Sequence, residues 1–281
     1  MRFGLLGTGY WARETHAAAL AAAPDTTLAG VWGRDPEKAA LLAGAVGARA
    51  YEDVDELLDA VDAVAIALPP DVQAPLAARA ARAGKHLFLD KPLALTVQAA
   101  DDVVAAVDAS GVKSVVFFTS RFRPEVVDFL SGAVGGSWDG ARAVLLGSVA
   151  GGPFGSSPWR NEHGGLWDVG PHALSLLLPV LGPVTRVTAA AGPHGTSTVL
   201  LVHSSGAVST MTLSLASPVT AWDVTFYGDS GWATVPAGGD HLDAAVRALA
   251  ALEAGDTACD VHFARDVVAI LASAAEAAPA P

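Results

Sequence analysis

The sequence is poor in cysteine and in basic residues. Its single cysteine, Cys259, excludes an internal disulfide bond and a metal cluster held by several thiolates. Lysine and arginine together number 17, against 29 aspartates and glutamates, which gives a formal net charge of −12. A nucleic-acid interface needs a basic face, so this balance argues against a nucleic-acid partner.

Long uncharged apolar runs are also missing, although 52% of the 281 residues are hydrophobic. No such run reaches the roughly 20 residues of a membrane-spanning helix. Residues 2–7 show no basic and apolar regions in series, as a secretory leader would. We therefore expect a soluble cytoplasmic protein with no membrane partner, long enough for one large or two medium domains.

Residues 1–119 alternate short apolar strands with helices. We expect strands at 2–7, 27–32, 48–51, 63–68, 86–89 and 113–119, and helices at 10–23, 36–45, 54–60, 72–83 and 96–110. Uninterrupted apolar strands between helices are typical of a parallel sheet that is covered on both faces and joined by right-handed crossovers. This pattern predicts a doubly wound Rossmann domain over residues 1–119.

After residue 119 the pattern changes to strands separated by glycine, proline or serine. We expect strands at 141–148, 184–190, 198–204, 207–215, 222–227 and 232–235, one helix starting near Asp168, and closing helices at 240–253 and 261–277. This order predicts a second α+β domain, residues 120–281, with an open-faced, mostly antiparallel sheet and helices on one face. An exposed sheet face predicts a homodimer or homotetramer.

The stretch Gly7-Thr8-Gly9-Tyr10-Trp11-Ala12 fits the pattern G-x-G-x-x-A between the first strand and the first helix. Gly7 permits a tight turn, Gly9 lets the backbone approach a pyrophosphate, and Ala12 allows close packing of helix and strand. The helix N-terminus then offers free N–H groups to the diphosphate. The pattern predicts a dinucleotide site, the alternative being a glycine turn without a ligand.

The end of the second strand decides which dinucleotide is preferred. An acidic residue there usually binds the adenosine ribose, but this chain has Gly33 followed by Arg34. Loss of the carboxylate and gain of a guanidinium favour a 2′-phosphate, so we predict NADP rather than NAD. Asp35 is the counter-argument, since it could serve as the acidic residue if the strand ends later, or could simply cap the next helix.

Two further segments carry chemistry. Lys91 follows the apolar strand at 86–89, at the ligand-binding edge of a parallel sheet, where an ammonium could hold a substrate hydroxyl. Asp168 and His172 stand four residues apart before an apolar stretch, and would share a helix face. Asp168 could instead be a helix cap, His172 a core histidine, or both with His163 metal ligands; we expect no metal, because no further cluster supports one.

Together these segments resemble the glucose–fructose oxidoreductase/inositol dehydrogenase family (Gfo/Idh/MocA). The motifs that carry the resemblance are Gly7 to Ala12, Ala83-Gly84-Lys85-His86-Leu87-Phe88-Leu89-Asp90-Lys91-Pro92, Arg121-Phe122-Arg123-Pro124, Trp159-Arg160, and Gly164 to His172. The resemblance implies an NAD(P)-dependent enzyme that moves a hydride between the cofactor and a hydroxyl or carbonyl of a sugar, cyclitol or related molecule. It also implies that Lys91, Asp168 and His172 form the catalytic group.

In that interpretation His172 is the acid/base, because the ordinary pKa of imidazole, about 6.5, suits neutral pH. Lys91 would stabilise the developing alkoxide, and Asp168 would bind a neighbouring hydroxyl or orient the other two. Arg121, Trp159 and Arg160 are candidates for the substrate pocket, with Asp168 and His172. The expected cofactor-binding residues are Gly7, Thr8, Gly9, Tyr10, Trp11, Gly33, Arg34, Leu68, Pro69, Asp90 and Lys91.

Three residues depart from the family pattern. Asp90 replaces a glutamate, Gln73 stands where many members have histidine, and Ser175 stands where an aspartate often follows the catalytic histidine. These departures leave the substrate open. Two other functions also stay open, a glycosidase of the same family that uses NAD in a transient oxidation, and a non-catalytic dinucleotide-sensing regulator.

Overall fold

The computed structural model describes residues 1–278, which form two compact units. The first unit contains residues 1–119 and 240–266, and the second contains residues 120–239 and the chain from 267 onward. The segment 240–266 had been expected in the second domain with its neighbours in sequence. Instead, α9 (His241–Ala254) packs against α1, β5 and β6 of the first unit.

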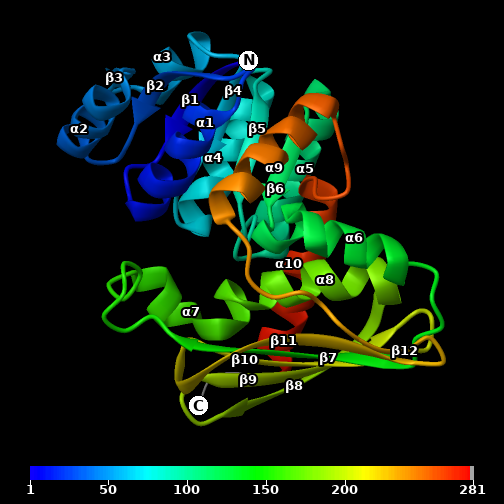
Figure 1. Cartoon of the computed structure of the whole chain (residues 1–281). Helices are drawn as coiled ribbons and strands as arrows, with labels where there is room; N and C mark the ends of the chain where they lie inside the picture. The colour runs from blue at the N-terminus through cyan, green and yellow to red at the C-terminus, as the bar shows by residue number, and fades with distance from the viewer. Residues whose placement is uncertain (279–281) are drawn as a thin grey trace. The chain divides into compact units, whose positions relative to one another are not determined.

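The first unit is built on a six-stranded parallel sheet with the order β3-β2-β1-β4-β5-β6 (Figure 1). Its strands are β1 (Arg2–Leu6), β2 (Thr27–Trp32), β3 (Arg49–Tyr51), β4 (Ala63–Ile66), β5 (His86–Asp90) and β6 (Ser114–Phe117). The crossovers are η1 (Ala12–Ala17, a π-helix), α1 (Ala18–Ala22), α2 (Pro36–Val46), α3 (Val54–Asp59), α4 (Pro70–Arg82) and α5 (Val97–Ser110). This strand order confirms the predicted Rossmann domain.

Local sequence explains where these elements begin and end. Asp35, Asp53 and Thr96 precede α2, α3 and α5, and each side chain accepts hydrogen bonds from backbone N–H groups of the first turn. Gly47 and Gly111 end α2 and α5 in the left-handed conformation that glycine adopts without strain. Strands β1, β4 and β6 are almost wholly buried, as expected for a sheet covered on both faces.

The second unit is built on a six-stranded mixed sheet with the order β12-β11-β7-β10-β9-β8. Its strands are β7 (Gly140–Ser148), β8 (Val184–Gly192), β9 (Thr196–His203), β10 (Val208–Ser214), β11 (Ala216–Gly228) and β12 (Gly231–Thr234). Only the central β10–β7 pair is parallel within this sheet, which agrees with the predicted, mostly antiparallel arrangement. Residues alternate along the strands: Leu145, Met211 and Phe226 are buried on one face, while Leu200 and Trp232 are exposed on the other.

The helices of the second unit differ from the expected single helix near Asp168. They are α6 (Pro124–Ala133), α7 (Pro158–Asp168), α8 (Gly170–Leu181) and the second half of α10 (Val261–Ala277), after the short 3₁₀-helix η2 (Thr119–Phe122). In Figure 1, α7 and α8 lie along one face of the second sheet. Within residues 1–278, no helix is long and apolar enough to cross a membrane.

Candidate active site

The glycine loop that follows β1 has the backbone geometry of a close turn. Gly7 has φ +134°, and a Cβ there would lie 2.4 Å from the carbonyl oxygen of Ala67. A Cβ on Gly9, in contrast, would meet nothing within 4 Å, because Gly9 faces open space. Ala12 is fully buried at the start of η1. The three positions therefore meet the steric requirements of a dinucleotide-binding turn.

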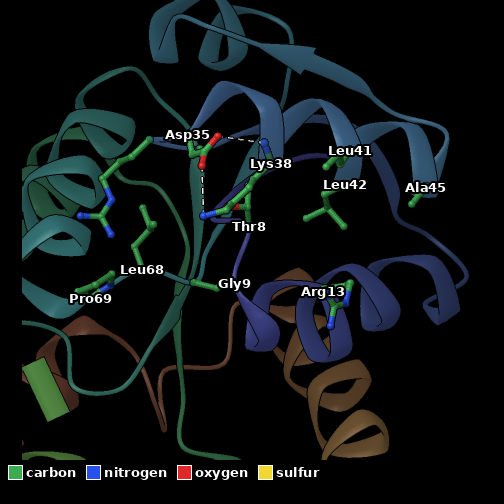
Figure 2. A pocket seen from close by; sticks show the side chains of 13 residues that line it. Thr8, Gly9, Arg13, Asp35, Lys38, Leu41, Leu42, Ala45, Leu68 and Pro69 are labelled. Atoms are coloured by element: carbon green, nitrogen blue, oxygen red, sulfur yellow. Dashed lines mark hydrogen bonds and ion pairs between the residues drawn. The ribbon is translucent and has the colours of Figure 1, made fainter. Parts of the chain in front are cut away.

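A cavity of about 740 Å³ opens beside this loop at the carboxyl ends of β1, β2 and β4 (Figure 2). It includes the predicted residues Thr8, Gly9, Gly33, Arg34, Leu68 and Pro69. It also includes Arg13, Lys38, Leu41 and Leu42, which were not foreseen from the motif. In Figure 2, Leu41 and Leu42 lie together beside Ala45, which gives this end of the cavity an apolar wall. A turn that only glycine fits, next to an apolar wall, suits a dinucleotide.

The charged groups at the end of β2 surround a helix cap. The side chain of Asp35 accepts hydrogen bonds from the backbone N–H groups of Glu37 and Lys38, at 3.1 and 3.2 Å. It also pairs with the Lys38 ammonium at 3.2 Å, and these contacts lower the pKa of the Asp35 carboxyl. β2 ends at Trp32, before this residue, so Asp35 is the cap of α2. Arg34 makes no ion pair within residues 1–278 and lines the cavity.

The Asp90-Lys91-Pro92 segment begins at the last residue of β5. Oδ1 of Asp90 accepts a hydrogen bond from Nε1 of Trp11 at 3.0 Å and lies 3.2 Å from Nε2 of His16. The predicted cofactor residues Trp11 and Asp90 are thus in contact through their side chains. His16, to which the sequence assigned no role, is fully buried and completes this cluster.

In the second unit, Asp168 ends α7 and His172 lies in the first turn of α8, so the expected single helix through both residues is wrong. Gly164 interrupts α7 with φ 63° and ψ −158°, and a new helix begins at Gly170, with Pro171 in its first turn. Asp168 does not cap that helix, whose N-cap is Val169. Asp168 is buried, and its carboxylate instead accepts a hydrogen bond from Nε of Arg160 at 3.1 Å.

Arg160 is itself fixed by aromatic rings. Its guanidinium carbon lies 4.5 Å from the ring centroids of both Phe154 and Trp159, which is the geometry of a cation–π contact. The predicted substrate residues Trp159, Arg160 and Asp168 therefore form one group on α7. Because the guanidinium neutralises the Asp168 carboxylate, the pair can present hydrogen-bonding atoms without an uncompensated buried charge.

The first turn of α8 is held by Arg121 and Ser175. Oγ of Ser175 donates to the carbonyl oxygen of His172 at 2.8 Å, and Arg121 donates to the carbonyl oxygen of Ser175 at 2.9 Å. Ser175, the departure from the family pattern, thus bonds to its own helix. The predicted pocket residue Arg121 reaches the backbone of the helix that carries His172.

Trp222 is a neighbour of His172 that the sequence did not single out. The two rings lie 5.5 Å apart in an edge-to-face arrangement, and Trp222 is 39% exposed. The register of β11 with β7 places Trp222 opposite Leu145, on the helix-covered face of the sheet. Its alternation with Val224 and Phe226 was the available signal, but alternation alone also describes core packing. Within residues 1–278, no group of three or more metal-ligating side chains occurs.

The fold and the glycine-lined cavity define a Rossmann-type dinucleotide-binding protein. A family model described as "Oxidoreductase family, NAD-binding Rossmann fold" matches residues 1–118, and one described as "GFO/IDH/MocA C-terminal domain" matches residues 142–234. The two models together cover most of the chain. The chain belongs to the GFO/IDH/MocA family of NAD-binding oxidoreductases.

Relatives with assigned names act on sugars and cyclitols. The chain is 32% identical over 190 residues to a dTDP-3,4-didehydro-2,6-dideoxy-alpha-D-glucose 3-reductase of Streptomyces antibioticus, covering 65% of this chain and 57% of the relative. It is 36% identical over 126 residues to an inositol 2-dehydrogenase of Rhizobium meliloti, covering 44% and 38%. The chain thus spans about half, or less, of the length of these curated relatives.

Solved structures are similar over nearly their whole length. The UDP-N-acetylglucosamine 3-dehydrogenase of Acidithiobacillus ferrooxidans has a TM-score of 0.86 at 25% identity, with coverage of 99% of this chain and 97% of that structure. This similarity supports the assignment of both units to the family fold.

Proposed function

We propose that this protein is an NADP-dependent dehydrogenase or reductase acting on a CH–OH group or carbonyl of a sugar, cyclitol or related small molecule. The observation that carries the proposal is the glycine turn at Gly7 and Gly9, which opens onto the cavity at the carboxyl ends of β1, β2 and β4. The names of the relatives support the substrate class. When bound, the nicotinamide supplies the hydride acceptor or donor.

The preference for NADP follows from the charges that line the cavity. Arg13, Arg34 and Lys38 are cationic there, and Asp35 is the acidic residue among them, already paired with Lys38. Gly33 places no carboxylate at the end of β2, so Arg34 is the group we assign to the 2′-phosphate. Gly7, Thr8, Gly9, Tyr10 and Trp11 form the loop proposed to hold the diphosphate.

For the chemical step, we assign proton transfer to His172, stabilisation of the alkoxide to Lys91, and a hydroxyl contact to Asp168. His172 lies beside an exposed indole, and Asp168 is fixed by Arg160, so both have defined orientations within the second unit. Arg121 and Trp159 complete the proposed pocket wall. An indole face suits the apolar side of a sugar ring, while the Arg160–Asp168 pair suits its hydroxyls.

The proposed oligomer is a homodimer or homotetramer formed through the exposed face of the second sheet. Leu200, Val208 and Trp232 are exposed large apolar residues on its strands, each more than a third accessible. Exposed large apolar residues on one face of a sheet are typical of a protein–protein contact.

The test is a cofactor-consumption screen with NAD and NADP over sugars, cyclitols, diols and ketones. On the best substrate, His172→Ala and Lys91→Ala should lower kcat by about 10²-fold or more, with NADPH binding retained in His172→Ala. Arg34→Ala should lower kcat/KM for NADP and spare NAD, whereas Arg82→Ala, on α4 and outside the cavity, should change neither. Unchanged kcat in both catalytic variants, or higher kcat/KM with NAD in the parent protein, would contradict these assignments.

A further inference from the structure

Gln73, in the first turn of α4, is a fully buried polar side chain that contacts the segment around Lys91. Its Oε1 accepts a hydrogen bond from the backbone N–H of Asp90 at 2.9 Å. Its Nε2 donates toward the carbonyl oxygens of Asp90, Pro92 and Leu93, at 2.8, 3.1 and 3.4 Å. One amide therefore meets backbone groups on both sides of Lys91.

These contacts give hydrogen-bond partners to backbone groups that lie beyond the end of β5. β5 ends at Asp90, so the carbonyl groups of Pro92 and Leu93 lie beyond its ladder with β4 and β6. Buried backbone groups outside a ladder need partners from side chains or water. A primary amide carries an acceptor and two donors, and Gln73 uses both kinds of atom here.

The side chain before Lys91 is fixed from another direction. Asp90 Oδ1 is held by Trp11 and His16, and His16 is fully buried against the rings of Phe88 and Phe117. Nδ1 of His16 has no hydrogen-bond partner within residues 1–278, so the imidazole makes its contact through Nε2, to Asp90. The Asp90 carboxylate cannot turn without breaking its contact with Trp11, the N-cap of η1, or with His16 inside η1.

We propose that Gln73 is a positioning residue for Lys91. It fixes the backbone of residues 90–93, while Trp11 and His16 fix Asp90, so that the ammonium of Lys91 projects from a rigid support. The inference rests on the proposed role of Lys91. Displacement of a reacting group by about 1 Å can cost roughly 10²-fold in rate, which makes the support measurable.

Two substitutions at Gln73 and two controls test the proposal. Gln73→Leu removes every hydrogen bond of the amide, and Gln73→His keeps one donor. Gln98→Leu is the same change at an exposed glutamine that contacts Asp102, away from this segment. Ala77→Gly, buried one turn further along α4, lowers stability while the amide of Gln73 is kept.

The readouts are kcat with the substrate from the screen, the Kd of NADPH by fluorescence quenching, and Tm. We expect kcat to fall about 10-fold or more in Gln73→Leu and less in Gln73→His, with the Kd of NADPH changed less than about threefold. Ala77→Gly should lower Tm and leave kcat unchanged, and Gln98→Leu should change neither.

Assaying Lys91→Ala in parallel separates the proposed catalytic role of Lys91 from the proposed positioning role of Gln73. If that variant retains the parental kcat, the proposed role of Lys91 is wrong and the role of Gln73 fails with it, whereas the oxidoreductase activity found in the screen stands. If Lys91→Ala is inactive but Gln73→Leu and Gln73→His match Ala77→Gly in kcat and Tm, Gln73 is only structural and the inference is overturned. Should Gln73→Leu not fold, Gln73→His carries the same comparison.

Discussion

The two six-stranded sheets of this chain differ in strand direction and in how many of their faces are covered. The first is parallel and buried on both faces, and the proposed cofactor residues lie at its strand ends. The second is mixed, with one face packed and the other exposed, and its proposed substrate residues lie mainly on helices over the packed face. The difference shows how a fully covered sheet restricts function to its edge, whereas a half-covered sheet also offers a surface.

The largest expected effect tests whether both sheets have a packed core. Phe88 in β5 and Phe226 in β11 are fully buried. Each change to alanine should lower the free energy of unfolding by about 3–5 kcal/mol, because it leaves a cavity as well as losing buried area. Urea unfolding measures both values. A cost below about 1 kcal/mol for Phe226→Ala would mean that the second sheet lacks a close-packed face.

Close strand pairing in the second sheet predicts the next effect. A Cβ on Gly140 would lie 2.0 Å from the carbonyl oxygen of Val208, whereas one on Gly147, in the same strand, would meet nothing within 4 Å. Gly140→Ala should therefore cost roughly 2–4 kcal/mol, since β7 and β10 must separate. Gly147→Ala is the matched control and should be nearly neutral. Equal Tm values for Gly140→Ala and Gly147→Ala would contradict the close approach of β7 and β10 at Gly140.

Buried histidines give the two units a pH dependence of the same sign. Burial lowers the pKa of His203, which bonds to the carbonyl of Gly182 and to Ser209, and of the half-buried His86. The unfolded chain then binds protons more readily than the folded one, so stability falls as pH drops below about 6.5. His203→Gln should flatten this slope more than His86→Gln does. Thermal unfolding between pH 7.5 and 5 measures it, and a slope unchanged in His203→Gln would exclude this residue as its source.

The smallest effect on intrinsic stability is expected at the exposed face. Trp232 is 65% exposed, so Trp232→Ser should change the free energy of unfolding of a single chain by less than about 0.5 kcal/mol. The proposed oligomer should nevertheless be weaker in Trp232→Ser. On dilution, the variant should dissociate at a higher protein concentration than the parent protein does. Sedimentation velocity over a dilution series is the measurement. An oligomer that is unaffected by both Trp232→Ser and Leu200→Ser would place the interface elsewhere.

Much of the first unit could be predicted from local sequence. Its strands are apolar throughout, and its helices carry caps such as Asp35 and Thr96, so both signals lie within a few residues. The helix boundary at Asp168 could not be predicted in this way. Gly164 and Pro171 are ordinary residues in a helix-like pattern, and the boundary between α7 and α8 falls at Val169, which has φ −102° and ψ −19°.

By itself, the sequence determined the alternation of strands and helices in the first unit and the position of the glycine loop, because periodicity and glycine spacing are local properties. Tertiary structure alone decided that 240–266 joins the first unit, that Gln73 meets both sides of Lys91, and that Trp222 lies beside His172. These contacts join residues far apart in the chain. Their distances depend on how whole elements pack, and no short stretch of sequence contains that information.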